Sequence, residues 1–267
     1  MLERLIGRAD RLQAVRTGPA SGLWIGARGI DPEMVRGTYE VNVQRALVGE
    51  LVAGDVFYDV GANIGFFSLL AARCVGPSGR VYAFEPLPGN CSAIRRSLVG
   101  NHIENVELCE AAAATSGGEA VLNVAQHIGG ATLDGWGVPP DLRERMRVRT
   151  VAIDELVFEC GWRSPDFVKI DVEGAEIAVL RGMEMTLERH RPGLLIELDD
   201  ASPGGLAEKK AAVLALLGRY GYALHPLADS YPNVEWQVCH LLFRADRSGP
   251  KASADSSSNA PRGAQRA

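Results

Sequence analysis

Four carboxylate side chains each stand at the end of an apolar stretch that has the length and composition of a buried strand. They are Asp59, Glu85, Asp171 and Glu197. The carboxyl ends of parallel strands meet at one edge of a sheet, and ligands bind at that edge. We therefore expect the four carboxylates to converge on one site, where they could accept hydroxyl protons, hold a ribose or attract a cationic amine.

Residues 59–65 have the pattern of a turn between a buried strand and a buried helix. Gly61 can adopt a positive φ, and Gly65 lets the backbone approach a ligand closely. The turn also contains Ala62 and Asn63, with Asn63 near the place of the middle glycine of a dinucleotide-binding turn. The start of the following helix offers free N–H groups to a ligand. The stretch therefore predicts a cofactor-binding turn that is not of the dinucleotide type.

The two acidic residues nearest this turn indicate which cofactor it binds. A carboxylate at Asp59 would repel a pyrophosphate and attract a cationic amine. Glu85, followed by Pro86, stands about 20 residues after the turn, where a carboxylate accepts both hydroxyls of an unphosphorylated ribose. A ligand with a ribose, a charged amino-acid end and no phosphate is S-adenosylmethionine (SAM). The same features disfavour a nicotinamide-dependent reductase.

Three further residues are expected at the cofactor. Glu110 and Ala111 follow a third predicted strand, whose end borders the adenine in a doubly wound sheet. Glu40 lies at the start of a predicted helix over residues 39–52, which we expect to cover the site. An alternative role for Glu40 is favourable charge at a helix start.

Asp171 is the first candidate for the catalytic group. It ends the strand that should lie beside the turn strand, and it could take a proton from an acceptor hydroxyl or bind a divalent ion such as Mg²⁺. Glu173 and Glu176 are second candidates, with helix-start charge as their alternative role. Lys169 precedes Asp171 by two residues on the same strand face and needs an acidic partner. No histidine stands out as a catalytic residue.

Strand-like and helical patterns alternate over residues 55–244, which predicts a parallel sheet covered on both faces. Residues 1–54 are expected to form an N-terminal helical lid, and 245–267 a disordered tail, because the tail has little apolar surface to bury. The glycine- and proline-containing residues 125–147 are expected to form a long functional loop beside the site. One continuous helix is expected between residue 177 and Pro192.

Composition narrows the class of protein. The chain has 267 residues, a formal net charge of −5 and five cysteines without a C-x-x-C pair. The length favours one domain with added elements, and the cysteine pattern favours a reducing cytoplasm. The negative net charge disfavours a protein whose main partner is nucleic acid. We expect no membrane span, because no apolar run is long enough.

Four motifs together resemble the FkbM-type SAM-dependent methyltransferases over residues 39–243. They are 59–65, 84–86, 168–176 and 180–182. The resemblance implies a class I (Rossmann-like) α/β methyltransferase fold, with a mostly parallel seven-stranded sheet and a reversed last strand. It also implies methyl transfer to a hydroxyl of a sugar or natural-product small molecule.

Two other functions stay open from the sequence. The first is N-methylation of a protein or amine, which needs less assistance from a base. The second is a non-catalytic SAM-binding protein, against which the intact acids at four predicted strand ends argue.

Overall fold

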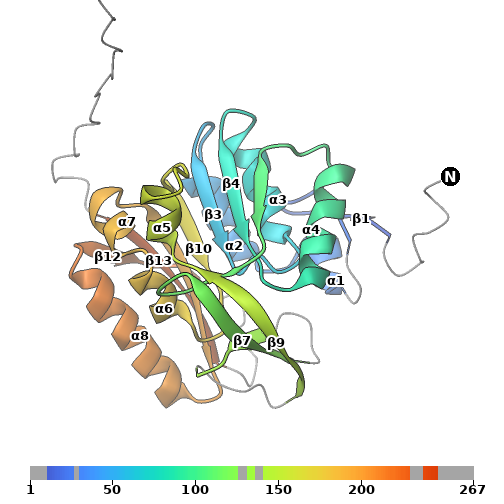
Figure 1. The fold of residues 1–267 in the computed structure, drawn as a ribbon. Coiled ribbons are helices and arrows are strands. Elements are labelled where there is room, and N and C mark those ends of the chain that lie inside the picture. Colours follow the sequence, from blue (N-terminus) through green and yellow to red (C-terminus); the bar gives the residue numbers. More distant parts are fainter. Residues whose placement is uncertain (1–10, 27–29, 126–130, 136–140, 229–236, 246–267) are drawn as a thin grey trace, which may run out of the picture.

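The computed structural model describes residues 11–26, 30–125, 131–135, 141–228 and 237–245. Its centre is a seven-stranded sheet in the order β12-β13-β11-β10-β3-β4-β5 (Figure 1). These strands are β3 (Val56–Val60), β4 (Arg80–Phe84), β5 (Val106–Cys109), β10 (Phe167–Ile170), β11 (Gly193–Asp200), β12 (Tyr222–His225) and β13 (Gln237–Ala245). The first expected tail residue, Ala245, ends β13, and residues 246–267 lie outside the described part.

Strand and helix alternate along this domain, as the sequence predicts. The helices are α3 (Phe66–Val75), α4 (Pro88–Gly100), α5 (Ile153–Phe158), α6 (Glu176–Arg181), α7 (Glu184–Arg189) and α8 (Pro203–Gly218). The pairs β11–β10, β10–β3, β3–β4 and β4–β5 are parallel. The fold is therefore α/β with a mostly parallel central sheet.

The last strand is reversed and lies inside the sheet, not at its edge. β13 pairs antiparallel with both β11 and β12. This pairing places His240 opposite Glu197. The predicted seven-stranded sheet with a reversed last strand is confirmed.

Two apolar layers cover the sheet. One contains Tyr58, Ile170 and Ile196 packed against α5 to α8, and the other contains Phe57 and Leu195 packed against the helices nearer the N-terminus. Side chains alternate between faces along a strand, so Asp59 and Lys169 share the second face with Phe57 and Leu195. Both polar residues are buried there beneath α3.

The described residues before the sheet form β1 (Gln13–Ala14), β2 (Trp24–Ile25), α1 (Pro32–Arg36) and α2 (Val41–Glu50). Val43 and Leu47 of α2 are fully buried in the second layer. α2 begins at Glu40, whose φ of 41° is left-handed. This turn aims the Glu40 side chain into the protein, where only 4% of the residue is exposed.

Most of the described residues in the expected loop 125–147 are β-structure, and 126–130 and 136–140 lie outside the described part. β7 (Gly118–Ala125) and β9 (Leu142–Val151) pair antiparallel up to Ala125 and Leu142, and they join β6 (Ala112–Ala113) and β8 (Ala131–Leu133) in a four-stranded sheet. We call β7, β8 and β9 the arm; it projects from the central sheet in Figure 1. Leu122, Leu133 and Val148 give it an apolar face of its own, which explains why it folds as a sheet.

The single helix expected between residue 177 and Pro192 is two helices, α6 and α7. The break follows Gly182, where a Cβ would lie 2.0 Å from the carbonyl oxygen of Ala114. The helix therefore breaks where the segment that contains Ala114 packs closely against Gly182. The apolar periodicity of the sequence does not indicate this contact. None of the helices in the described part is long and apolar enough to cross a membrane.

Candidate active site

A pocket of about 770 Å³, partly open to solvent, lies at the carboxyl ends of β3, β4, β10 and β11. Its lining includes the predicted site residues Gly61, Asn63, Glu85, Pro86, Asp171 and Glu173. The arm forms one wall with Leu122, Ala131 and Leu133. The pocket has the mixed apolar and polar lining of a small-molecule site.

The turn after β3 has the geometry that its glycines predict. Gly61 has a φ of 82°, and a Cβ there would lie 1.8 Å from the backbone oxygen of Asp171. Asn63 is also left-handed, with a φ of 51°. Gly65 caps α3, and a Cβ there would press on Ile94 at 2.9 Å. Gly61 and Asn63 therefore line the pocket from this turn, whereas Gly65 and the buried Ala62 do not line it.

Glu85 is fixed by backbone donors on both oxygens. The Asn63 N–H donates to Oε2 at 2.9 Å, and the Leu87 N–H donates to Oε1 at 2.8 Å. Burial raises the pKa of Glu85 to about 7, although these hydrogen bonds favour the ionised form. A carboxylate oxygen has two lone pairs, so each can still accept a ligand hydroxyl.

Small side chains line the pocket near Glu85, but they are not the residues that the sequence predicts there. Ala112 and Ala113 line the pocket, one and two residues after Ala111. Glu110 points away and forms an ion pair with Arg95, with 48% of its side chain exposed. The structure therefore brings neither Glu110 nor Ala111 to the pocket lining.

Asp171 lines the pocket, and its carboxylate forms an ion pair with a buried lysine. The Nζ atom of Lys169 is 2.6 Å from Oδ2 of Asp171, and only 1% of the lysine side chain is exposed. Burial alone would lower the pKa of Lys169, but the carboxylates of Asp171, Asp59, Glu40 and Glu197 raise it. The ammonium is thus a permanent charge beneath Asp171.

Asp59 does not reach the pocket lining. Its carboxylate accepts a hydrogen bond from the Ser68 hydroxyl of α3, and it lies opposite Lys169 in the β3–β10 register. Only 1% of the residue is exposed. Asp59 therefore acts on the site through Lys169 and the position of α3.

Glu173 and Glu176 lie in different surroundings. Glu173 lines the pocket with a left-handed φ of 53°. Burial and the nearby Asp171 raise its pKa to about 9, so the carboxyl is protonated at neutral pH and can donate a hydrogen bond. Glu176 accepts the Gly174 N–H at 2.7 Å and is buried at the start of α6.

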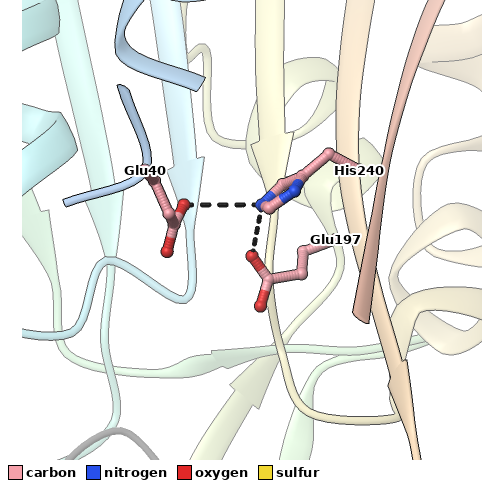
Figure 2. Close-up of side chains that lie close together, drawn as sticks. All are labelled: Glu40, Glu197 and His240. Atoms are coloured by element: carbon pink, nitrogen blue, oxygen red, sulfur yellow. Dashed lines mark ion pairs between the residues drawn. The ribbon is translucent and has the colours of Figure 1, made fainter. Parts of the chain in front are cut away.

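A buried histidine stands between two glutamates beside this pocket (Figure 2). The Nε2 atom of His240 is 2.6 Å from Oε2 of Glu197 and 3.5 Å from Oε2 of Glu40. Burial alone would lower the pKa of His240, but the two carboxylates raise it to about 9. Burial and Asp171 raise the pKa of Glu197 to about 7. The imidazole therefore holds the shared proton at neutral pH.

The same three side chains are spaced closely enough to share a metal ion, with ligand atoms within 4.8 Å of one another. Asp171 does not belong to this group. Among the three, only Glu197 lines the pocket. The sequence singles out no histidine as a catalytic residue, and His240, which antiparallel pairing brings opposite Glu197, does not line the pocket.

The fold and the pocket define a class I methyltransferase. Among solved structures, M. jannaschii TYW2 in complex with AdoMet (SAM) matches with a TM-score of 0.52 and 13% identity, over 91% of this chain and 90% of that one. Trm5b from Pyrococcus abyssi also gives a TM-score of 0.52, with 11% identity, over 90% of this chain and 57% of that one. These likenesses concern the fold alone.

The family model of the methyltransferase FkbM domain matches residues 59–224. The chain belongs to the FkbM methyltransferase family. It is 30% identical over 201 residues to the 31-O-demethyl-FK506 methyltransferase FkbM of Streptomyces tacrolimicus, which covers 66% of this chain and 75% of that protein. It is 29% identical over 152 residues to the hexuronic acid methyltransferase AglP of Haloferax volcanii, covering 56% of this chain and 58% of that protein.

A third relative is much longer than this chain. The AMB antimetabolite synthetase AmbE of Pseudomonas aeruginosa is 30% identical over 213 residues of alignment. The match covers 66% of this chain. The matched part is only 10% of AmbE.

Proposed function

We propose that this methyltransferase transfers the methyl group of SAM to a hydroxyl oxygen of a small molecule, either a sugar or a natural product. The observation that carries the proposal is the position of Asp171, which lies in the pocket at the end of β10 with a buried ammonium behind it. The printed names of two relatives refer to a demethyl-FK506 compound and to a hexuronic acid. Both are compatible with a small-molecule acceptor.

The residues of the pocket fit SAM. Glu85, held by two N–H donors, is suited to the ribose hydroxyls, and Ala112 and Ala113 leave space for a flat ring. Gly61 and Asn63 present backbone where the amino-acid end would pass. Residues 1–54 contribute Tyr39 to the lining, which supports their expected role as a cover over the domain formed by 55–244.

When bound, SAM supplies a methyl group on a positively charged sulfur. The acceptor oxygen forms a new C–O bond as the C–S bond breaks, and the bonding electron pair stays with the sulfur. The Asp171 carboxylate takes the hydroxyl proton and passes it to water. An alcohol is a poor nucleophile without such a base, so this step depends on Asp171.

We propose direct proton transfer instead of a metal at Asp171. The Nζ atom of Lys169 already lies 2.6 Å from this carboxylate, and a Mg²⁺ ion would have to be bound against that charge. The lysine fixes one of the carboxylate oxygens of Asp171. Lys169 is therefore a positioning residue.

The test is calorimetry with SAM, followed by transfer of labelled methyl groups to a panel of alcohols, sugars and amines. We expect SAM binding and labelled O-methyl products. Labelled amines alone would favour the N-methyltransferase alternative. SAM binding without any labelled product would favour a non-catalytic SAM-binding protein.

A further inference from the structure

Two carboxylates of the pocket stand side by side on neighbouring strands. Asp171 directly follows Ile170 and Glu197 directly follows Ile196, and these isoleucines are paired in the parallel β10–β11 register. Adjacent strands lie about 4.8 Å apart. Both carboxylates line the same pocket.

Each of the two carboxylates forms an ion pair with a buried cationic side chain. Lys169 Nζ lies 2.6 Å from Asp171, and His240 Nε2 lies 2.6 Å from Glu197. Oε2 of Glu40 lies 3.5 Å from the same Nε2 atom, so the imidazole nitrogen is placed between two glutamates (Figure 2). Both carboxylates are thus oriented before an acceptor arrives, which is how a rigid recognition site is built.

A carboxylate recognises hydrogen-bond donors, and it disfavours another anion. Four acidic residues line this pocket: Glu85, Asp171, Glu173 and Glu197. No lysine, arginine or histidine belongs to the lining among the residues that the structure describes. Glu173 is protonated at neutral pH and adds no charge. An acceptor with neutral hydroxyl groups fits this surface, whereas an acceptor carboxylate would meet the carboxylates of Asp171 and Glu197.

We infer that the acceptor is a neutral compound with two adjacent hydroxyl groups, and that Glu197 binds the hydroxyl next to the one that Asp171 deprotonates. His240 and Glu40 are positioning residues that hold Glu197 for this contact. The apolar arm residues Leu122 and Leu133 face the remainder of the acceptor. This inference rests on the proposed O-methyltransferase function and specifies its acceptor.

The experiment compares matched acceptors with labelled SAM. The pairs are trans-1,2-cyclohexanediol against cyclohexanol, and a methyl glucoside against the corresponding methyl glucuronoside. We expect kcat/KM for the diol to exceed that for the mono-ol by tenfold to a hundredfold, the range for a hydrogen bond to a charged group. The glucoside should exceed the glucuronoside.

Variants assign the preference to Glu197. Glu197→Gln should remove the diol preference and keep calorimetric binding of S-adenosylhomocysteine. His240→Asn should reduce the preference, mainly through KM for the diol. Asp200→Asn is the control, because Asp200 lies on the same strand, outside the pocket lining, and is engaged with Ser202 and Lys209.

Three results would overturn the inference. They are equal turnover of diol and mono-ol, a glucuronoside preferred over the glucoside, and no methylation of any hydroxyl compound. The first two leave the proposed O-methyltransferase function standing. The third, with methylated cyclohexylamine in the same assay, would remove that function as well.

Discussion

His240 and Glu197 face each other across antiparallel strands β13 and β11, with Nε2 and Oε2 2.6 Å apart. Glu40 reaches the same nitrogen from the turn before α2. The His240 side chain of β13 therefore contacts both β11 and the segment that precedes α2.

The stability that His240 contributes should depend on pH. Its pKa in the folded protein is about 9, against 6.5 for the free side chain. The contribution is therefore complete below pH 6.5 and is lost as the pH rises to 9. His240→Asn should lower the free energy of unfolding by roughly 3 kcal/mol at pH 6 and by less at pH 9.5. Urea unfolding across this range measures the difference.

The control for this prediction is His225→Asn, a histidine on the neighbouring strand β12 that does not line the pocket. A constant difference between wild type and His240→Asn from pH 6 to 9.5 would mean that the imidazole is neutral in the folded protein.

Glu85 should make SAM binding depend on pH near neutrality. Its pKa of about 7 means that the carboxyl is protonated at lower pH and loses capacity to accept ligand hydroxyls. SAM affinity should fall as the pH drops from 8 to 6. Glu85→Gln should weaken binding by roughly tenfold to a hundredfold and flatten this dependence. Isothermal titration calorimetry measures both effects.

Glu110→Gln is the matched comparison, because the sequence predicts this residue at the cofactor and the structure turns it towards Arg95. It should leave SAM affinity unchanged. Equal losses in both variants would contradict the pocket described above.

Asp171→Asn should reduce turnover about a hundredfold, the usual effect of losing a general base. An amide can still accept a hydrogen bond from Lys169, so SAM affinity should stay within severalfold of the wild type. Activity should also be insensitive to EDTA. Normal turnover with lowered stability would leave Asp171 with a structural role only, and activity restored by Mg²⁺ after chelation would place a metal at the site.

Gly61→Ala should destabilise the protein more than left-handed strain alone, which costs about 1–2 kcal/mol. The added Cβ would lie 1.8 Å from the Asp171 carbonyl oxygen, so the turn or the end of β10 must move. Gly89→Ala is the control: Gly89 is exposed in α4, and a Cβ there has no atom within 4 Å. That substitution should stabilise the helix by up to roughly 1 kcal/mol. Thermal unfolding compares the two variants, and similar melting temperatures would refute this account of Gly61.

The sequence predicts the central sheet well because each strand is marked by its own residues. Val56–Val60 and Phe167–Ile170 are short apolar runs followed by glycine-containing turns, and their alternation with helices implies a parallel sheet. Asp171 and Glu85 reach the pocket as predicted because each directly follows its strand. Local pattern is sufficient for these features.

The parts that the sequence misses depend on contacts between distant segments. Asp59 lies beneath α3 because Ser68 and Lys169 are brought to it by the fold. β11 continues past Glu197 to Asp200 because β13 supplies an antiparallel partner. The role of His240 follows from that register, which no spacing within residues 237–245 indicates.

The place of β13 has a consequence for synthesis on the ribosome. β13 is the last strand in the chain but lies between β11 and β12, which bracket it in the sheet. A nascent chain that has emerged only as far as His225 therefore has an unpaired edge along β11, and β12 has no partner strand. It also lacks the imidazole that balances Glu40 and Glu197. The domain can close only when residues 237–245 leave the exit tunnel, so we expect the nascent protein to need protection of the β11 edge until that moment.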